Sequence, residues 1–575
     1  MADIIGTNGN DTLVGSYDDD TINGRAGNDT ITDSFGYDTL TGGGGKDKFV
    51  IDVRYNYYYY YFSDNRITTI TDFGGVGKGT NPTAAVIAEV DTLIFLGDGL
   101  TFQGYGLTAQ NLLLTQNGND LEITFAGVDG GLVTLQNFAL ENLDNLSKST
   151  GASVDLGNIL FYEQTSITDS FDVFNANSTQ NIIFNKNTVT FLNDLSNNVN
   201  GFDNSDDVIN GQGGDDIIDG KSGNDLLRGG AGNNTLNGGA GDDILNVDSS
   251  SGNNLLSGGN GNDFLRSFSS SGKNTLNGGA GDDNLNVDSS LGNNLLSGGD
   301  GNDFLSASGY ASGIGISFRD DKKSKGNNTL NGGTGDDSLN VDSSSGNNLL
   351  SGGDGNDSLS ASGYVRTVFS SEDNFFYYLS SGNNTLKGGA GNDTLNASGS
   401  TGNNLLSGGD GDDYLDISSL LQVGSYTDYT SQSSGNNTLN GGTGNDTLTA
   451  SGSYGNNLLS GGDGNDSLYG GDDTDTFAFN SYKEGIDNLY DFNATNDLIQ
   501  VSADGFGGGL STPSLKADQF TIGTSATTSS QRFIYNDITG GLFFDLDGSA
   551  SGFTQVKFAE LSAGLSLTEN NFVVV

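Results

Sequence analysis

The chain of 575 residues has a formal net charge of −51 and contains 92 glycines, two prolines, and neither cysteine nor histidine. Without cysteine there is no disulfide scaffold or thiol nucleophile, and without histidine there is no serine triad and none of the usual zinc and haem ligands. So large an excess of negative charge disfavours nucleic acid and anionic membranes as partners and favours cations.

The chain opens with consecutive nonapeptides. GTNGNDTLV, GSYDDDTIN, GRAGNDTIT, DSFGYDTLT and GGGGKDKFV fill residues 6 to 50, each with aspartate in the sixth position. The first residues, MADIIGTNGNDTL, have no basic start and no apolar core, so they do not read as a secretory signal peptide. We predict a short first β-roll over residues 1–50.

Residues 51–201 are predicted to form a β-rich capping and intervening domain. The tyrosine-rich run from Tyr55 to Phe62 reads as an exposed edge strand or loop, with a carbohydrate or partner surface as the alternative. ITTITDF and the later DTLIFLG read as strands that close the open end of the roll. Between Gly106 and Leu140, polar and apolar residues alternate around Asn117-Gly118 and Asp129-Gly130, which we expect to be hairpin turns.

Residues 202–478 repeat one nine-residue phrase, written most cleanly as GGAGDDILN from Gly238 to Asn246. The eighth position is leucine in every consecutive copy from Leu236 to Leu468. Each copy offers a six-residue turn and a three-residue strand with one inward side chain, so a single copy cannot bury a core. This pattern predicts an all-β chain, a long parallel solenoid with a column of leucines inside.

The turns of the repeat are suited to a hard cation. Glycines supply left-handed backbone angles that let a tight turn aim its carbonyl oxygens at one point, and the sixth-position aspartate adds a carboxylate. A flexible shell of oxygens selects calcium over softer metals. Without metal, so much Gly, Asn, Ser and Asp is typical of a disordered tract, so folding is expected to depend on calcium.

At this point the sequence resembles the RTX (repeats in toxin) family of haemolysin-type calcium-binding proteins. The resemblance implies a parallel β-roll with two nonapeptides per coil, and several calcium ions, each shared between turns of successive coils on one edge. Gly106 to Leu140, and VTFLNDLSNNVNGFDNSDDVINGQGGDD further on, are similar to segments that accompany such repeats in large secreted cyanobacterial members. The predicted metal ligands are Asp11, Asp20, Asp29, Asp38, Asp47, Asp207, Asp216, Asp225, Asp243, Asp263, Asp283, Asp303, Asp337, Asp357, Asp393, Asp413, Asp446, Asp466 and Asp475.

The two edges of the long roll differ. When alternate copies are assigned to two edges, aspartate occupies every sixth position on one edge, whereas on the other it returns only near the ends, at Asp216 and Asp475. The other edge carries Asn234, Asn254, Asn274, Asn294, Asn328, Asn348, Asn384, Asn404, Asn437 and Asn457. We expect these asparagines to form a hydrogen-bonded amide ladder. A weaker, neutral calcium row is the alternative, because amide carbonyls also ligate calcium.

Insertions are confined to the asparagine edge. Every insertion between Val247 and Ser451 precedes an asparagine turn, and three are long arms rich in aromatic residues: Ala307 to Lys322, Ala361 to Tyr378 and Ile417 to Ser431. The seventh-position residues after these turns alternate as Thr235, Leu255, Thr275, Leu295, Thr329, Leu349, Thr385, Leu405, Thr438 and Leu458. Strand alternation points them outward, so we expect an apolar stripe covered by the arms or by a neighbouring protomer.

Residues 479–575 are predicted to form a C-terminal β cap. GIDNLYDF followed by NDLIQV repeats the closing pattern of the first roll. The ending ENNFVVV resembles the uncleaved signal by which RTX proteins leave cells through type I secretion, and a simple final strand is the alternative. In DLDGS, Asp545 and Asp547 fit either another calcium site or a hairpin turn.

The sequence favours a secreted, calcium-dependent structural protein of the cell surface or extracellular matrix, and not an enzyme. It would fold on binding calcium outside the cell and self-associate through the insertion-bearing edge into a fibre or layer. The expected partners are calcium, the type I secretion machinery and further copies of the chain, with no nucleic acid and no membrane span. The alternatives are a toxin, which needs a membrane-active stretch, or the export module of a secreted enzyme that uses carboxylates, such as a glycosidase.

Overall fold

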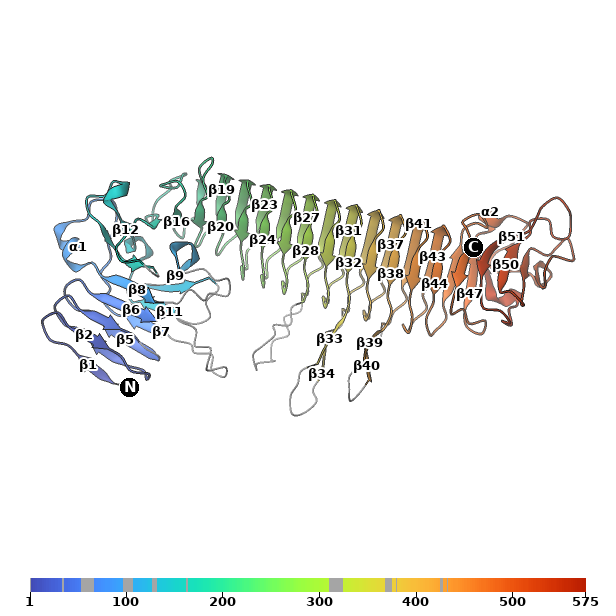
Figure 1. Cartoon of the computed structure of the whole chain (residues 1–575), viewed down its shortest axis with the longest axis horizontal. Helices are drawn as coiled ribbons and strands as arrows, with labels where there is room; N and C mark the ends of the chain where they lie inside the picture. The colour runs from blue at the N-terminus through green and yellow to red at the C-terminus, as the bar shows by residue number, and fades with distance from the viewer. Residues whose placement is uncertain are drawn as a thin grey trace. The chain divides into compact units, whose positions relative to one another are not determined.

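The computed structural model describes residues 2–33, 36–52, 67–96, 107–126, 132–161, 164–309, 324–367, 375–378, 380–423, 428–431 and 433–575. It divides into two compact units, Met1–Asn246 and Val247–Val575, and within each unit short strands stack side by side (Figure 1). Almost all regular structure is β. The helices in the described residues are α1 (Ala84–Glu89), α2 (Ala503–Phe506) and the short 3-10 turns Ala109–Asn111, Leu140–Asn142, Lys148–Thr150, Ala517–Gln519 and Glu569–Asn571.

The first unit begins with a short roll of two parallel sheets. One sheet holds β1 (Asp3–Ile5), β3 (Thr21–Asn23), β5 (Tyr37–Thr41) and β7 (Ile67–Ile70), and the other holds β2 (Thr12–Val14), β4 (Thr30–Thr32), β6 (Lys48–Asp52) and β8 (Thr92–Leu96). Ile4 pairs with Ile22, and Ile22 with Leu40, so strands one coil apart are two nonapeptides apart. The β-roll predicted from the sequence is therefore confirmed.

The nonapeptide pattern stops near Ile51, but the stacking continues. β7 pairs with β5, and β8 pairs with β6, both in parallel. The antiparallel strands β9 (Leu112–Asn117), β10 (Asp120–Phe125) and β11 (Leu132–Leu135) extend the first sheet through β11, and β14 (Ile159–Leu160) adds to β8. β12 (Asn145–Leu146) and β13 (Leu156–Gly157) form a separate two-stranded sheet. The strands after the repeats thus close the roll from within its own sheets.

One predicted hairpin turn is displaced by a residue. Asn117 pairs with Asp120, so the two-residue loop is Gly118-Asn119 and not Asn117-Gly118. Gly118 takes the positive φ of 61° that this loop requires, which explains why glycine sits at its first position. The predicted turn at Asp129-Gly130 and the tyrosine run from Tyr55 to Phe62 lie outside the described residues.

The second roll starts before the position that the repeat indicated. The first unit contains β15 (Phe171–Val173), β16 (Val189–Phe191), β18 (Val208–Asn210), β20 (Leu226–Arg228) and β22 (Ile244–Asn246) in one sheet, and β17 (Asn198–Asn200), β19 (Ile217–Ser222) and β21 (Thr235–Ala240) in the other. Stacking therefore begins at Phe171 and not at Phe202. The Phe171 and Phe191 rings pack edge to face at 5.9 Å, so they fill the core where the aliphatic column ends.

In the second unit, one sheet is built mostly from six-residue strands. It contains β23 (Leu255–Asn260), β25 (Thr275–Ala280), β27 (Leu295–Asp300), β29 (Thr329–Thr334), β31 (Leu349–Asp354), β35 (Thr385–Ala390), β37 (Leu405–Asp410), β41 (Thr438–Thr443), β43 (Leu458–Asp463), β45 (Thr476–Phe479), β47 (Leu498–Val501) and β52 (Phe572–Val574). All of these strands run parallel. β52 pairs with β47, so the last residues of the sequence form the closing strand.

The opposite sheet of the second unit has three-residue strands. These are β24 (Phe264–Arg266), β26 (Asn284–Asn286), β28 (Phe304–Ser306), β30 (Ser338–Asn340), β32 (Ser358–Ser360), β36 (Thr394–Asn396), β38 (Tyr414–Asp416), β42 (Thr447–Thr449), β44 (Ser467–Tyr469) and β46 (Asp487–Leu489). The C-terminal strands β48 (Phe520–Ile522), β49 (Phe533–Tyr535), β50 (Gly541–Phe544) and β51 (Val556–Glu560) complete it. Beyond the roll, Phe506, Phe533, Phe544 and Phe558 pack into an aromatic core.

Two columns of side chains fill the second roll. The predicted leucines, such as Leu276 and Leu296, are fully buried. The second column was not predicted from the sequence and comes from the insertions themselves: Val247, Ser267, Val287, Ala307, Val341, Ala361, Ala397, Ile417 and Ala450 are all buried. Each insertion therefore begins with an inward residue that adds to the core next to the asparagine edge.

Two of the long arms contain antiparallel hairpins. The second arm pairs β33 (Tyr364–Thr367) with β34 (Phe375–Tyr378), and the third pairs β39 (Leu420–Val423) with β40 (Asp428–Ser431). Most of the first arm lies outside the described residues.

Candidate calcium-binding edge

The sixth-position aspartates form buried rows. Asp283 is 2% exposed, its Oδ1 accepts the backbone N–H of Asp263 at 2.8 Å, and its own N–H donates to Oδ1 of Asp303 at 2.8 Å. The same contact links each aspartate to the next from Asp303 to Asp466. The row therefore uses one carboxylate oxygen of every aspartate to hold the preceding coil.

The second carboxylate oxygen is left without a protein hydrogen bond. Among the described residues, Oδ2 is buried and has no hydrogen-bond partner in Asp29, Asp38, Asp47, Asp216, Asp225, Asp283, Asp303, Asp337, Asp357, Asp393, Asp413, Asp446, Asp466 and Asp475. A buried anion with an unsatisfied oxygen is strongly unfavourable unless a cation accompanies it. This repeated atom is the direct structural indication of a metal row.

A carbonyl oxygen from the next coil approaches the same point. A Cβ added to Gly278 would overlap Oδ2 of Asp283 and would lie 2.7 Å from the carbonyl oxygen of Gly298. The same arrangement recurs at Gly332, where Oδ2 of Asp337 and the Gly352 carbonyl converge. The leading glycine is therefore needed because any side chain would fill the space that these oxygens share. Carboxylate and carbonyl oxygens from two coils are the ligands that calcium takes.

Burial makes the row electrostatically unfavourable without metal. Desolvation raises the pKa of Asp283 to about 7, and the like charges of Asp263 and Asp303 act in the same direction. Burial, together with Asp303 and Asp357, raises the pKa of Asp337 to about 7. No three acidic side chains form a compact metal cluster in the part of the chain that the structure describes. A cation here must therefore take most of its ligands from backbone carbonyls, with one carboxylate per turn.

Three predicted ligands differ from the rest because their Oδ2 atoms are already engaged. Oδ2 of Asp11 accepts the N–H and hydroxyl of Thr7, and Oδ2 of Asp20 accepts the same two groups of Ser16. Oδ2 of Asp207 accepts the N–H of Phe202 at 2.8 Å. Thr7 and Ser16 occupy the second position of their turns, whereas Phe202 occupies the first position of its repeat. These aspartates form closed turns at the start of a row.

The position-two residue explains the difference. Where Oδ2 is left over, as in the turns of Asp29, Asp216 and Asp225, the second residue has a positive φ: 78° at Arg25, 68° at Gln212 and 83° at Lys221. Thr7 and Ser16 do not adopt this conformation, and in the Asp207 turn the bond comes from Phe202, one position earlier. The left-handed residue turns its N–H away from the carboxylate, which leaves the oxygen available.

Sequence reasoning missed the aspartates that end the rows. Oδ1 of Asp91 accepts the N–H of Asp47 at 2.7 Å, and its Oδ2 accepts the N–H of Gly74. Asp497 does the same for Asp475, and its Oδ2 accepts the N–H of Asn493. Both oxygens are satisfied, so these two rows end in a carboxylate that the protein itself pairs. The available signal was an aspartate directly before a short apolar strand, as in DTL and DLI.

The Asp-Phe pairs that follow each roll are caps, as the sequence indicated. Asp72 accepts the N–H groups of Gly42 and Gly43, and Asp491 accepts those of Gly470 and Gly471. Each carboxylate thus satisfies the last glycine turn, while the following Phe73 or Phe492 is buried.

The asparagine edge forms the predicted amide ladder. Oδ1 of Asn294 accepts both the backbone N–H and Nδ2 of Asn274, and its Nδ2 donates to Ser290 Oγ, to the Gly292 carbonyl and to Asn328 Oδ1 at 3.0–3.1 Å. The same pattern joins Asn328, Asn348, Asn384, Asn404, Asn437 and Asn457. On this edge, hydrogen bonds within the protein satisfy the polar side-chain atoms of the turns, whereas on the aspartate edge a cation would be needed to do so. From Asn254 onward, the residue four before each asparagine is a serine in the second position of the repeat, where the aspartate turns from Asp243 to Asp466 have glycine.

A matching family model bears on the chemistry. A model described as the RTX calcium-binding nonapeptide repeat (4 copies) matches residues 5–32, 24–50, 203–227, 219–250, 246–267, 268–289, 286–309, 342–363, 378–399, 397–416, 432–453 and 451–481. The chain carries RTX calcium-binding nonapeptide repeats. The matches fall in both predicted rolls, and the gaps within the second, residues 310–341, 364–377 and 417–431, include most of the three long arms. The chain matches none of the curated proteins with which it was compared.

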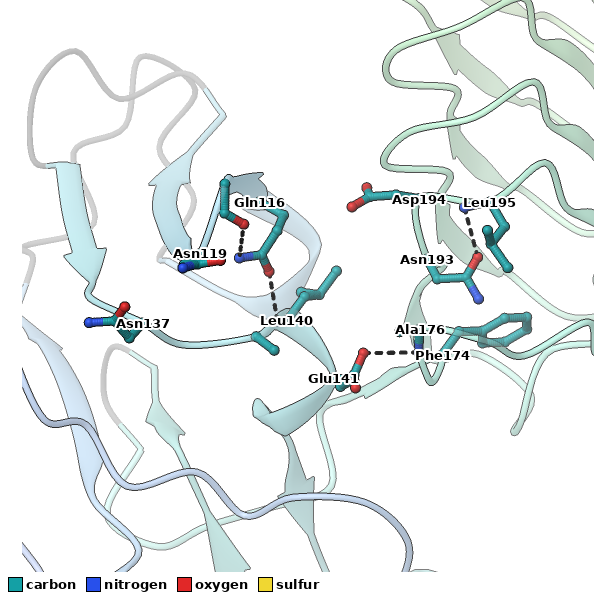
Figure 2. A pocket seen from close by; sticks show the side chains of 12 residues that line it. Gln116, Asn119, Asn137, Leu140, Glu141, Phe174, Ala176, Asn193, Asp194 and Leu195 are labelled. Carbon is teal, nitrogen blue, oxygen red and sulfur yellow. Dashed lines mark hydrogen bonds between the residues drawn. The ribbon is translucent and has the colours of Figure 1, made fainter.

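A separate hollow of about 540 Å³ lies in the first unit, between the β9–β10 hairpin and the first coils of the second roll. Its polar side chains serve the backbone around them. Gln116 Oε1 accepts the N–H of Leu140, and Glu141 Oε2 accepts the N–H of Ala176 (Figure 2). Asn193 likewise donates to the carbonyls of Asn175 and Ser178. These groups join two parts of the unit.

Proposed function

We propose that this RTX-repeat protein is a secreted structural protein of the cell surface or extracellular matrix whose rolls fold when they bind calcium outside the cell. The observation that carries the proposal is the repeated buried Oδ2, which faces a glycine carbonyl and has no protein partner. Calcium is kept scarce in the cytoplasm and is abundant outside, so a row that is unstable without it would fold after export.

The large share of repeats and closing strands among the described residues supports a structural role. The repeats and the strands that close them account for most of the described residues, and in the hollow of the first unit Gln116 and Glu141 are engaged in holding the backbone. None of the helices in the described ranges is long and apolar enough to span a bilayer. We therefore assign the chain a scaffolding task and not an enzymatic one, with type I secretion as its export route and self-association through the insertion-bearing side.

Two measurements test the proposal. Far-ultraviolet circular dichroism should show little β signal in chelator and a large gain with millimolar calcium. On intact cells, surface labelling should detect the protein in calcium, and chelator should release it or make it sensitive to protease. An identical β signal with and without calcium, or a protein found only inside the cells, would contradict the proposal.

A further inference from the structure

One outer face of the second unit is periodic over two coils. The first residue of each strand from β23 to β43 is alternately leucine and threonine, and hydrogen-bonded register places these residues in one line. The leucines are exposed: Leu255 45%, Leu295 41%, Leu349 40% and Leu405 40%, and Leu458 is half-buried. The third residue of each strand alternates between serine and asparagine, apart from Lys387. These two lines carry no carboxylate, although the chain has a net charge of −51.

The alternation of leucine and threonine continues across the three long arms. The three long arms separate Leu295 from Thr329, Leu349 from Thr385, and Leu405 from Thr438, yet each pair is in direct register. Core packing requires only the inward leucine of each strand. The inward leucine directly beneath this face is the same in every strand, so it does not account for the alternation of the outward residue, and the pattern points to a requirement on the outside.

We propose that this face binds the same face of a second copy of the chain, related by a two-fold axis that runs parallel to the strands. If the axis lies between a leucine strand and a threonine strand, every leucine faces a threonine of the partner. Neighbouring strands are about 4.8 Å apart, so leucine ridges repeat every ~9.6 Å, and a shift of one strand seats each ridge between two ridges of the partner. The interface is then self-complementary, as a two-fold dimer requires.

The size of the face is consistent with a specific dimer. The strands from β23 to β43 span about 43 Å at ~4.8 Å each, and five residues of each strand cover about 17 Å. The product, about 700 Å², is close to the ~800 Å² per partner that a stable interface typically buries. Because the face exists only in the folded roll, the proposal rests on the calcium-dependent folding proposed above.

One border of the face opposes association. The last residues of the leucine strands, Asp300, Asp354, Asp410 and Asp463, are exposed on the side of the calcium turns. In the two-fold arrangement these aspartates meet those of the partner at the rim. Screening by salt should therefore strengthen the dimer, which distinguishes it from an ion-paired interface that salt would weaken.

The test compares two triple variants in calcium by sedimentation velocity and circular dichroism. Wild type should form a species of twice 59.4 kDa as its concentration rises. Leu295→Asp, Leu349→Asp and Leu405→Asp together should remain monomeric. The matched control, with Ser338→Asp, Ser358→Asp and Thr394→Asp on the opposite sheet, should dimerise like wild type.

Replacing the rim residues Asp300, Asp354 and Asp410 by asparagine should lower the dimer dissociation constant several-fold. Wild type that folds in calcium but stays monomeric at high concentration would overturn the dimer, and so would a leucine variant that still dimerises. Failure of wild type to fold in calcium would instead overturn the proposed function. The two failures are therefore distinguishable.

The chain has no cysteine, so the orientation is open to direct cross-linking. Leu349→Cys mixed with Thr329→Cys or with Thr385→Cys should give disulfide-linked dimers on oxidation. Leu349→Cys alone should give few, because leucine never faces leucine in this arrangement. Efficient self-linking of Leu349→Cys would overturn the two-fold arrangement.

Discussion

A reciprocal pair of isosteric substitutions separates the two edges. Asp283→Asn keeps the Oδ1 that accepts the N–H of Asp263 but replaces the unpartnered Oδ2 by an amide group that cannot ligate a cation. Asn294→Asp keeps the Oδ1 acceptor but removes the donors to Ser290, to Gly292 and to Asn328. The two changes have equal size and opposite charge, so differences in their effects report on the edge.

The expected magnitudes differ in kind. Each bound ion makes the free energy of unfolding rise by about 1.4 kcal/mol per tenfold increase in calcium, and contributes ~2.7 kcal/mol at one hundred times its Kd. Asp283→Asn should lose one ion, or two if the carboxylate is shared between neighbouring ions. For each ion lost, the variant's free energy of unfolding should rise by about 1.4 kcal/mol less per tenfold increase in calcium. Asn294→Asp loses three hydrogen bonds at about 1 kcal/mol each, and this loss of ~3 kcal/mol is the same at every calcium concentration at which the roll is folded.

Isothermal titration calorimetry gives the number of ions bound. Urea unfolding at several calcium concentrations gives the slope of the free energy of unfolding against the logarithm of the calcium concentration. Asp283→Asn should bind one or two fewer ions and show a shallower slope. Asn294→Asp should bind as many ions as wild type. Its free energy of unfolding should be lower than that of wild type but should rise with calcium at the same slope. Equal loss of calcium in both variants would refute the assignment of one metal edge and one amide edge.

Three further predictions use the same rows. In chelator, lowering the pH from about 7 toward 4 should restore part of the β signal seen by circular dichroism. Burial raises the pKa of Asp393 to about 7. Folding is therefore favoured when this carboxyl group is protonated, and the stability that it contributes is lost as the pH rises through about 7. In calcium, acidification should instead weaken binding as protons compete, and calcium affinity independent of pH between 5 and 8 would contradict both statements. Leu296→Ala, at a fully buried position, should lower the free energy of unfolding in calcium by about 2–5 kcal/mol, whereas the exposed neighbour Leu295→Ala should change it by less than ~1 kcal/mol in urea titrations. Asp207→Asn should leave the number of bound ions unchanged in calorimetry, because Phe202 and Ser205 already occupy its oxygens, and loss of an ion would show that this turn opens to bind metal.

The sequence was sufficient for the features that repeat. The nine-residue period predicted the parallel stack, and the eighth-position leucines predicted the buried column, since a solenoid places equivalent residues one above the other. It also predicted the amide ladder of the asparagine edge and the outward line from Leu255 to Leu458, because both follow from strand alternation and register alone. The resemblance to RTX proteins supplied two nonapeptides per coil, which the pairing of Ile22 with Leu40 bears out.

The tertiary structure decided everything that happens once the repeat ends or is interrupted. Sequence gave no reason to separate Asp11, Asp20 and Asp207 from the other aspartates, because the distinction depends on where a neighbouring N–H points. Asp91 continues the row of Asp47 although 44 residues separate them, and spacing along the chain cannot show that a long excursion returns to the next coil. The start of the second roll at Phe171 and the inward turn of each insertion were missed for the same reason. Both are set by what fills the core, and the nine-residue period does not show the direction of side chains that lie outside the repeated nonapeptide.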